Sequence, residues 1–99
     1  MNEQAITVVA TFQAKAGKAA ELKKNLLALI EPTRREAGCL NYDLHQLPED
    51  PDKFLFHENW TSRAHLDAHL KNTHIQTLLP RLEKLCVGLP EIKIWEKIG

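Results

Sequence analysis

Alternation of apolar and polar side chains predicts four β-strands along this chain. The first segment is rich in β-branched residues and places Val8, Ala10 and Phe12 on one face. Turn-forming residues over 48–52 separate the second segment from the third and indicate a hairpin between them. The predicted strands are residues 6–13, 40–46, 54–61 and 91–98.

A helical period replaces this alternation after the first strand. From Lys18 the apolar side chains recur every three to four residues as far as Ala37, which predicts a long amphipathic helix. Pro32 lies inside this pattern and lacks an amide hydrogen, so we expect the helix to bend there. Gly38 is a typical residue at which such a helix ends.

A second helical region, with a break in it, is predicted over residues 62–86. Ser62 is suited to cap its first piece. Thr73 and Gln76 have the form of a capping box that opens the second piece, and Pro80 should kink that piece. The apolar face of the second piece consists of Ile75, Leu78, Leu79, Leu82 and Leu85.

The resulting order of elements is β-α-β-β-α-β, which is the ferredoxin-like arrangement of the α+β class. In this arrangement helices cover one face of a four-stranded antiparallel sheet, and residues 1–99 are expected to form one domain. Because the other face mixes polar and apolar side chains, we expect a second copy of the chain to cover it across a two-fold axis, as a homodimer. The side chains predicted on that face are Val9, Thr11, Leu55, Asn59 and Trp95.

Composition and charge narrow the expected partners. The 99 residues are 43% hydrophobic and 26% charged, which is typical of a soluble globular domain. Thirteen basic and thirteen acidic residues give zero net charge, so neither nucleic acid nor an anionic membrane surface is an expected partner. The chain has no apolar run of the roughly 20 residues that span a bilayer, and its first residues do not resemble a secretory signal. We therefore expect a cytoplasmic protein, in which Cys39 and Cys86 are reduced thiols.

Glu58 is the most informative single residue. Strand alternation places it on the same face as Phe54, Phe56 and Trp60, toward the predicted helices. A carboxylate in that position must either find hydrogen-bond partners or take a raised pKa, and both conditions suit a general base or a group that orients a substrate. The structural alternative is a carboxylate that caps a helix or pairs with a basic side chain near the end of the strand.

Three histidines fall in the second helical region. His65 and His69 have the i, i+4 spacing of a metal-binding pair, but no third ligand is evident and no metal is expected. A helical wheel places His69 at the border of the apolar face, next to Leu66 and Leu70, whereas His65 is rotated toward water. His69 is therefore the better candidate for a pocket, and His74 could close one end of a cleft between the sheet and the helix. A purely structural role for each stays equally open.

Aromatic side chains on the same side of the sheet indicate a ligand slot. Tyr42 and Trp60, as cross-strand neighbours, could wall a slot for a flat aromatic ligand, although core packing explains them as well. His45 and His57 lie on the outer face of the hairpin, nearly opposite each other, where a dimer interface is the simpler explanation. The sequence has no glycine-rich phosphate loop and no nucleophile elbow, so no nucleotide cofactor is expected.

The order and spacing of several short motifs resemble a known family. These motifs are the segment 54–60, Ala64, His69 with Leu70, Thr73 with His74, the segment 38–42 and the segment 15–18. Together they resemble the antibiotic biosynthesis monooxygenase domain, and the resemblance spans essentially the whole chain.

That resemblance implies a dimeric α+β barrel. Members of the family include cofactor-independent oxygenases of quinols and anthrones, heme-degrading oxygenases and isomerases of a phosphorylated signalling sugar, and the quinol branch is the most similar. The heme-degrading branch has an asparagine and a tryptophan where this chain has Ala10 and His69, and the polyketide oxygenases have an asparagine where Phe56 stands. The pocket positions that the resemblance implies are Ala10, Phe12, Phe56, Glu58, Trp60, His69 and His74.

The function implied by the resemblance is cofactor-independent oxidation of a small quinol, or a related hydroxy-aromatic, by molecular oxygen. The substrate would lie beside Trp60 and Phe56 in a dry slot. His69 or Glu58 would accept a phenolic proton, and His74 would orient the substrate or stabilise the developing oxyanion. Two alternatives stay open: an isomerase of a phosphorylated sugar, and a non-catalytic dimer that binds a small hydrophobic ligand.

Overall fold

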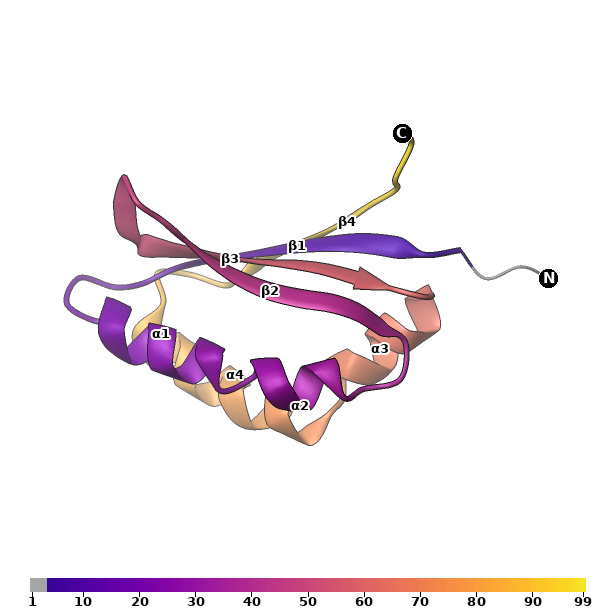
Figure 1. Ribbon diagram of the computed structural model, residues 1–99. Coiled ribbons are helices and arrows are strands. Elements are labelled where there is room, and N and C mark those ends of the chain that lie inside the picture. Colours follow the sequence, from indigo (N-terminus) through magenta and orange to yellow (C-terminus); the bar gives the residue numbers. More distant parts are fainter. Residues whose placement is uncertain (1–3) are drawn as a thin grey trace.

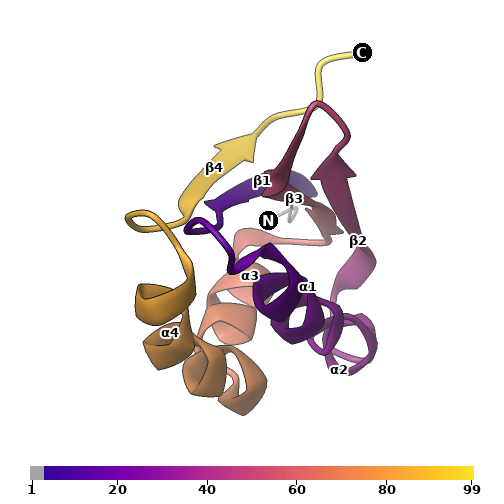
Figure 2. The ribbon, with the colours of Figure 1, turned by 90° about the vertical axis from the view of Figure 1, so that its left-hand side faces the viewer.

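An antiparallel sheet with helices packed on one of its faces forms the framework of the molecule (Figure 1). The computed structural model describes residues 4–99. Within this range the elements are β1 (Ile6–Gln13), α1 (Ala19–Leu27), α2 (Ile30–Arg34), β2 (Cys39–Leu47), β3 (Asp50–Trp60), α3 (Arg63–Leu70), α4 (Thr73–Leu85) and β4 (Glu91–Trp95). The strand order across the sheet is β2-β3-β1-β4, and Figure 2 shows all the helices on the same side of it. This is the ferredoxin-like α+β fold that the sequence predicts.

Strand pairing brings Glu58 to the middle of the sheet. β3 is antiparallel to both of its neighbours, and Glu58 is paired with Val8 on β1 and with Tyr42 on β2. Directly opposite residues of antiparallel strands point to the same face, so these three side chains lie together on the helix-covered side. The predicted inward face of the third strand is confirmed, since Phe56, Glu58 and Trp60 are all buried.

The hairpin between β2 and β3 is tighter than its turn-rich sequence predicts. β3 begins at Asp50, so the turn comprises residues 48–49 rather than the predicted 48–52. The Gln46 side-chain amide donates to the Pro51 carbonyl over 2.7 Å. This cross-strand hydrogen bond holds the early end of β3 against β2, although turn-forming residues occupy it.

The first helical region consists of two short helices, not one bent helix. Ala28 and Leu29 form a turn between α1 and α2, one helical turn before Pro32. The break lies there because Pro32 has no amide hydrogen to donate to the Ala28 carbonyl. α2 then ends at Arg34, so the predicted extension of the helix to Ala37 is wrong.

Gly38 does not end a helix but allows two segments to pack closely. Its φ angle is +83°, and a Cβ atom at this position would overlap the ring of His65 on α3. The Gly38 carbonyl also accepts a hydrogen bond from the Thr61 amide over 2.8 Å. Only glycine combines this backbone conformation with this contact, which fixes the start of β2 against the start of α3.

The second helical region contains the two predicted helices, α3 and α4, and one of its two predicted caps differs. Ser62 caps α3 as predicted, and its hydroxyl accepts from the His65 amide over 3.3 Å. The cap of α4 is Asn72, whose side chain accepts from the Thr73 amide over 3.0 Å. The predicted capping box, which begins at Thr73, is therefore wrong. α4 also continues through Pro80, because the packing of its apolar face outweighs the lost hydrogen bond.

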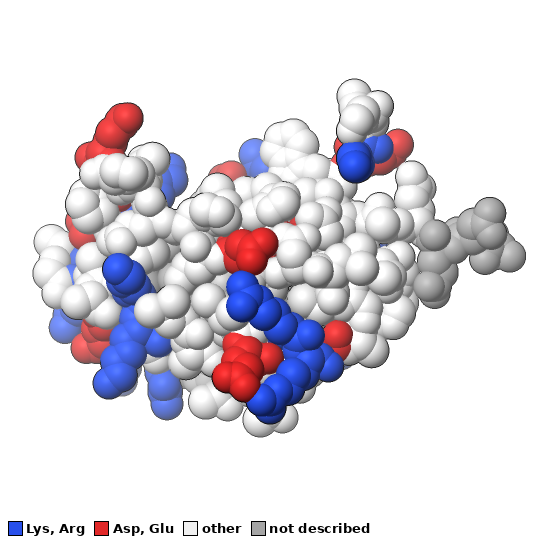
Figure 3. All heavy atoms as spheres, viewed as in Figure 1, with Lys and Arg blue, Asp and Glu red and all other residues white. Residues whose placement is uncertain are grey.

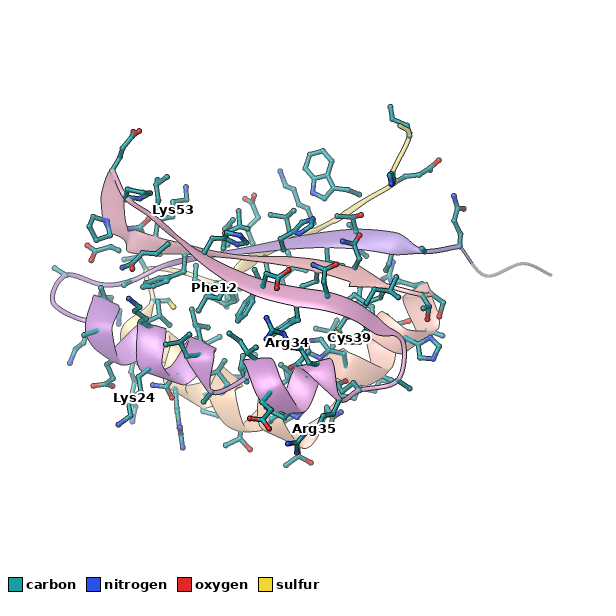
Figure 4. The ribbon with its side chains drawn as sticks, viewed as in Figure 1. Phe12, Lys24, Arg34, Arg35, Cys39 and Lys53 are labelled. Carbon is teal, nitrogen blue, oxygen red and sulfur yellow. The ribbon has the colours of Figure 1, made fainter. Side chains whose placement is uncertain are left out.

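The main core lies between the sheet and the helices. Figure 4 shows Phe12 in this layer. Tyr42 stacks on Phe56 with ring centroids 4.3 Å apart, and Phe56 meets Phe12 edge to face. On the outside, Figure 3 shows basic and acidic side chains interspersed over one face of the molecule. No helix within residues 4–99 has the length and apolar character needed to cross a membrane.

The outer face of the sheet carries a chain of polar hydrogen bonds. The Thr7 hydroxyl donates to the side-chain oxygen Oδ1 of Asn59 over 2.6 Å, and the side-chain amide of Asn59 donates to Oδ1 of Asn41 over 2.7 Å. β4 ends at Trp95 rather than near residue 98, and Trp95 is 55% exposed. A second copy of the chain over this face stays a prediction.

Candidate active site

A small cavity lies between the sheet and the helices, with a volume of about 70 Å³. Its wall is apolar except for the side chains of Glu58, His69 and Tyr42. The structure therefore brings most of the predicted site residues together around one space. The predicted site residues that line it are Ala10, Phe12, Tyr42, Phe56, Glu58 and His69.

Glu58 presents a buried carboxyl group to this cavity. The side chain is 4% exposed, and the Trp60 indole nitrogen donates to Oε1 of Glu58 over 2.9 Å. Burial raises the pKa of Glu58 to about 7, and the nearby carboxylate of Glu36 adds to this rise, whereas the hydrogen bond from Trp60 opposes it. At neutral pH the group can therefore both accept and release a proton.

His69 lines the cavity from the last turn of α3 and is held by a second carboxylate. Its Nδ1 atom lies 2.7 Å from Oε2 of Glu36, and its ring packs against the Trp60 indole with centroids 4.7 Å apart. Burial lowers the pKa of His69, although the hydrogen bond to Glu36 opposes this effect. In the neutral ring, Nδ1 donates to the carboxylate and Nε2 carries the lone pair. Nε2 is therefore the nitrogen available to the cavity.

Glu36 is the site residue that sequence reasoning missed. It lies in the connection between α2 and β2, and its Oε2 atom is 2.7 Å from His69 Nδ1 and 2.8 Å from His74 Nε2. A signal was present, because Glu36 stands three residues after Thr33 on the apolar stripe of the predicted helix. An acid at such a position needs a buried partner, as does Glu58 on its strand.

Two predicted site residues lie behind the cavity wall. Trp60 is fully buried and, within the described residues, is outside the cavity lining, so the predicted slot between Trp60 and Tyr42 is not formed. The strand register explains this, because Tyr42 is paired with Glu58 and Trp60 with Cys39. His74 is likewise outside the lining of the described residues and contacts Glu36, so it acts on the cavity only through Glu36 and His69.

The other histidines lie apart from the site. His65 is half-buried rather than turned to water, and its Nδ1 lies 2.8 Å from the Ser62 hydroxyl, which accounts for its position without a metal. His45 is paired with Leu55 and His57 with Asp43, so the two histidines are offset along the hairpin and not opposite.

Comparison with known proteins places these features in a family. The family model described as antibiotic biosynthesis monooxygenase matches residues 5–81. An uncharacterized protein of Synechocystis is 31% identical over 92% of this chain and 62% of its own length. A Mycobacterium tuberculosis protein provisionally named a monooxygenase is 36% identical over 70% of this chain and 67% of its own length. The chain thus spans about two thirds or less of these curated relatives.

Solved structures match over the whole fold. A crystal structure from Pseudomonas aeruginosa has a TM-score of 0.93 at 33% identity and covers 100% of this chain and 99% of that chain. The structure of the same Mycobacterium tuberculosis protein has a TM-score of 0.91 at 25% identity, with 97% of each chain covered.

Proposed function

This chain belongs to the antibiotic biosynthesis monooxygenase family, and on that premise we propose that it oxidises a small quinol or related hydroxy-aromatic with molecular oxygen, without a cofactor. One observation carries the proposal. A carboxyl group and a histidine nitrogen with a free lone pair, from Glu58 and His69, face an otherwise apolar cavity. Such an arrangement suits removal of a phenolic proton in a site that excludes water.

In this reaction the protein binds and positions the substrate and transfers a proton. Nε2 of His69 or the Glu58 carboxylate accepts the phenolic proton, which leaves an electron-rich anion able to react with oxygen. One oxygen atom enters the ring and the other leaves as water, and the quinol supplies all four electrons. Glu36 and His74 act as positioning residues, because they hold Nδ1 of His69 and with it the orientation of the ring.

The cavity must widen to hold such a substrate. Its volume of about 70 Å³ is roughly half that of a cavity known to bind benzene, which is about 150 Å³. Leu79 on α4 and Ile92 on β4 line the cavity and are 44% and 46% exposed, so the space reaches the surface between these two elements. We expect the substrate to enter there.

The apolar wall weighs against the phosphorylated-sugar alternative. Within the described residues, no lysine or arginine lines the cavity, whereas a phosphate group requires cationic or multiple amide partners. A non-catalytic binder of an apolar molecule is the competing proposal, and oxygen consumption separates it from an enzyme.

The test is oxygen uptake with a panel of reduced naphthoquinones and no added cofactor, with ¹⁸O₂ to follow the oxygen atom. We expect uptake and one labelled atom in the product. Glu58→Gln and His69→Gln should each lower turnover by about 100-fold or more if that residue is the proton acceptor. His45→Ala, an exposed histidine outside the site, is the matched control. Binding without oxygen uptake, or parental turnover by both folded site variants, would refute the proposal.

A further inference from the structure

A second chemical feature lies directly behind the cavity wall. Glu36, His69 and His74 each present one ligand atom, and these three atoms all lie within 4.8 Å of one another. We propose that this cluster binds a divalent transition-metal ion such as Zn²⁺, and that binding converts the cavity-facing nitrogen of His69 from a hydrogen-bond acceptor to a donor. The second half of this proposal rests on the proposed function, because it makes the ion an inhibitor of that same site.

The geometry is close to that of a metal centre. Oε2 of Glu36 lies 2.7 Å from Nδ1 of His69 and 2.8 Å from Nε2 of His74. Ligand atoms around a tetrahedral zinc ion lie about 3.3 Å apart, given bonds of about 2.0 to 2.1 Å. To form a coordination shell, Oε2 has to move away from each nitrogen by about half an ångström, and the two imidazole nitrogens, which lie within 4.8 Å of each other, have to reach a separation of about 3.3 Å.

The donor set and its burial suit the ion. Two imidazoles and one carboxylate form a familiar three-ligand set for zinc, with one position left for water. The side chains of His69, Glu36 and His74 are 3%, 10% and 20% exposed, so the cluster is nearly dry and opens on the His74 side. An ion can enter from that side and keep a water ligand there.

Neighbouring groups hold the histidine rings in place. The Trp60 indole packs against the ring of His69, and outer contacts of this kind hold metal ligands in place in known centres. The hydroxyl of buried Thr33 lies 3.2 Å from Nε2 of His74, the atom that would bind the ion, so this contact gives way on metal binding, as the hydrogen bond to Glu36 does. The same contacts also complete a metal-free hydrogen-bond network, so direct metal binding has to be measured.

Coordination changes the chemistry that His69 offers to the cavity. A neutral imidazole carries one proton, and in the hydrogen-bonded cluster that proton lies on Nδ1 and points to Glu36. When Nδ1 binds a metal ion, the proton must lie on Nε2. The cavity then loses the lone pair that would accept a phenolic proton.

The first experiment measures binding with Co²⁺ as the probe, in tag-free protein of the full chain. We expect one saturable site with visible absorption bands, and displacement of Co²⁺ by Zn²⁺. Glu36→Gln and His74→Ala should each weaken Co²⁺ binding by about 100-fold or more, since even outer-shell changes cost about 10- to 100-fold. His45→Ala should bind as the parent does.

Two results would overturn the metal site. One is the lack of a saturable Co²⁺ signal, which would leave the cluster as a hydrogen-bond network only. The other is unchanged binding in folded Glu36→Gln and His74→Ala variants. His74→Asn, which keeps a polar side chain of smaller size, replaces His74→Ala if circular dichroism shows that the alanine variant is unfolded.

The second experiment separates this proposal from the proposed function. Nitrogen-15 NMR of His69 should show the proton on Nδ1 without metal and on Nε2 with Zn²⁺, and an unchanged tautomer would refute the switch. If Nε2 of His69 rather than Glu58 accepts the phenolic proton, Zn²⁺ should also abolish oxygen uptake, and a chelator should restore it. A protein that binds Co²⁺ but never consumes oxygen refutes only the oxygenase, whereas one that consumes oxygen and binds no Co²⁺ refutes only the metal site.

Discussion

Polar side chains on the two faces of the sheet have different environments. On the helix-covered face, Glu58 is 4% exposed, and Trp60 donates a hydrogen bond to one of its two oxygens. On the outer face, its neighbour in the chain, Asn59, exchanges hydrogen bonds with Thr7 and Asn41. Adjacent residues of one strand therefore meet a dry and a polar environment.

This difference shows where chemistry can be expected. Burial with incomplete hydrogen bonding shifts the pKa of an ionisable group, as it does for Glu58. Neutral amides and hydroxyls that are fully hydrogen-bonded contribute cohesion and do not titrate. We therefore expect reactivity on the inner face and cohesion on the outer face, where contact with a second copy stays a prediction.

The largest expected effect is on packing of the inner face. Phe56→Ala removes a ring that is 1% exposed and should lower the free energy of unfolding by about 3 to 5 kcal/mol. Leu55→Ala, at the half-buried next position on the outer face, should cost about 1 kcal/mol. Urea unfolding of both variants measures this difference. Equal losses would mean that the two faces are buried to the same extent in solution.

A smaller effect follows from the pKa of Glu58. Burial raises that pKa from 4.5 to about 7, so the folded state holds a proton that the unfolded state releases between these values. Stability from this group is therefore present below about pH 4.5 and is lost as pH rises to about 7, by up to about 3 kcal/mol in total.

Glu58→Gln isolates that contribution. Because glutamine does not titrate, the stability of the parent relative to this variant should fall as pH rises from 4.5 to 7.5. Thermal or urea unfolding of both proteins across that range gives the difference in stability. The lowered pKa of His69 makes stability rise with pH, but it does so in both proteins and therefore cancels in this difference. Parallel curves would show that Glu58 is solvated in the folded state.

The smallest effect is expected on the outer face. Asn59→Ala removes hydrogen bonds to Thr7 and Asn41 and should cost about 1 kcal/mol, because water replaces part of what is lost at this half-buried position. The pH dependence assigned to Glu58 should stay unchanged. A shift in that dependence in Asn59→Ala would show that the two faces are coupled through β3.

Local periodicity was sufficient to predict most of the fold. Alternation in β3 depends only on the geometry of an extended chain, so it correctly placed Phe56, Glu58 and Trp60 on the helix-covered face. The helical period similarly placed His69 at the cavity. The break at residues 28–29 and the cap at Asn72 were missed, because several local signals compete there and packing selects among them.

The sequence by itself determined the order of elements, the inward set of side chains and the presence of a buried acid on β3. Only the tertiary structure decided which groups meet. Glu36 contacts His69 across 33 residues and His74 across 38, and Trp60 supports the cavity from behind instead of lining it. The physical reason is that periodicity sets the direction in which a side chain points, whereas contact between distant segments depends on how strands register and helices pack.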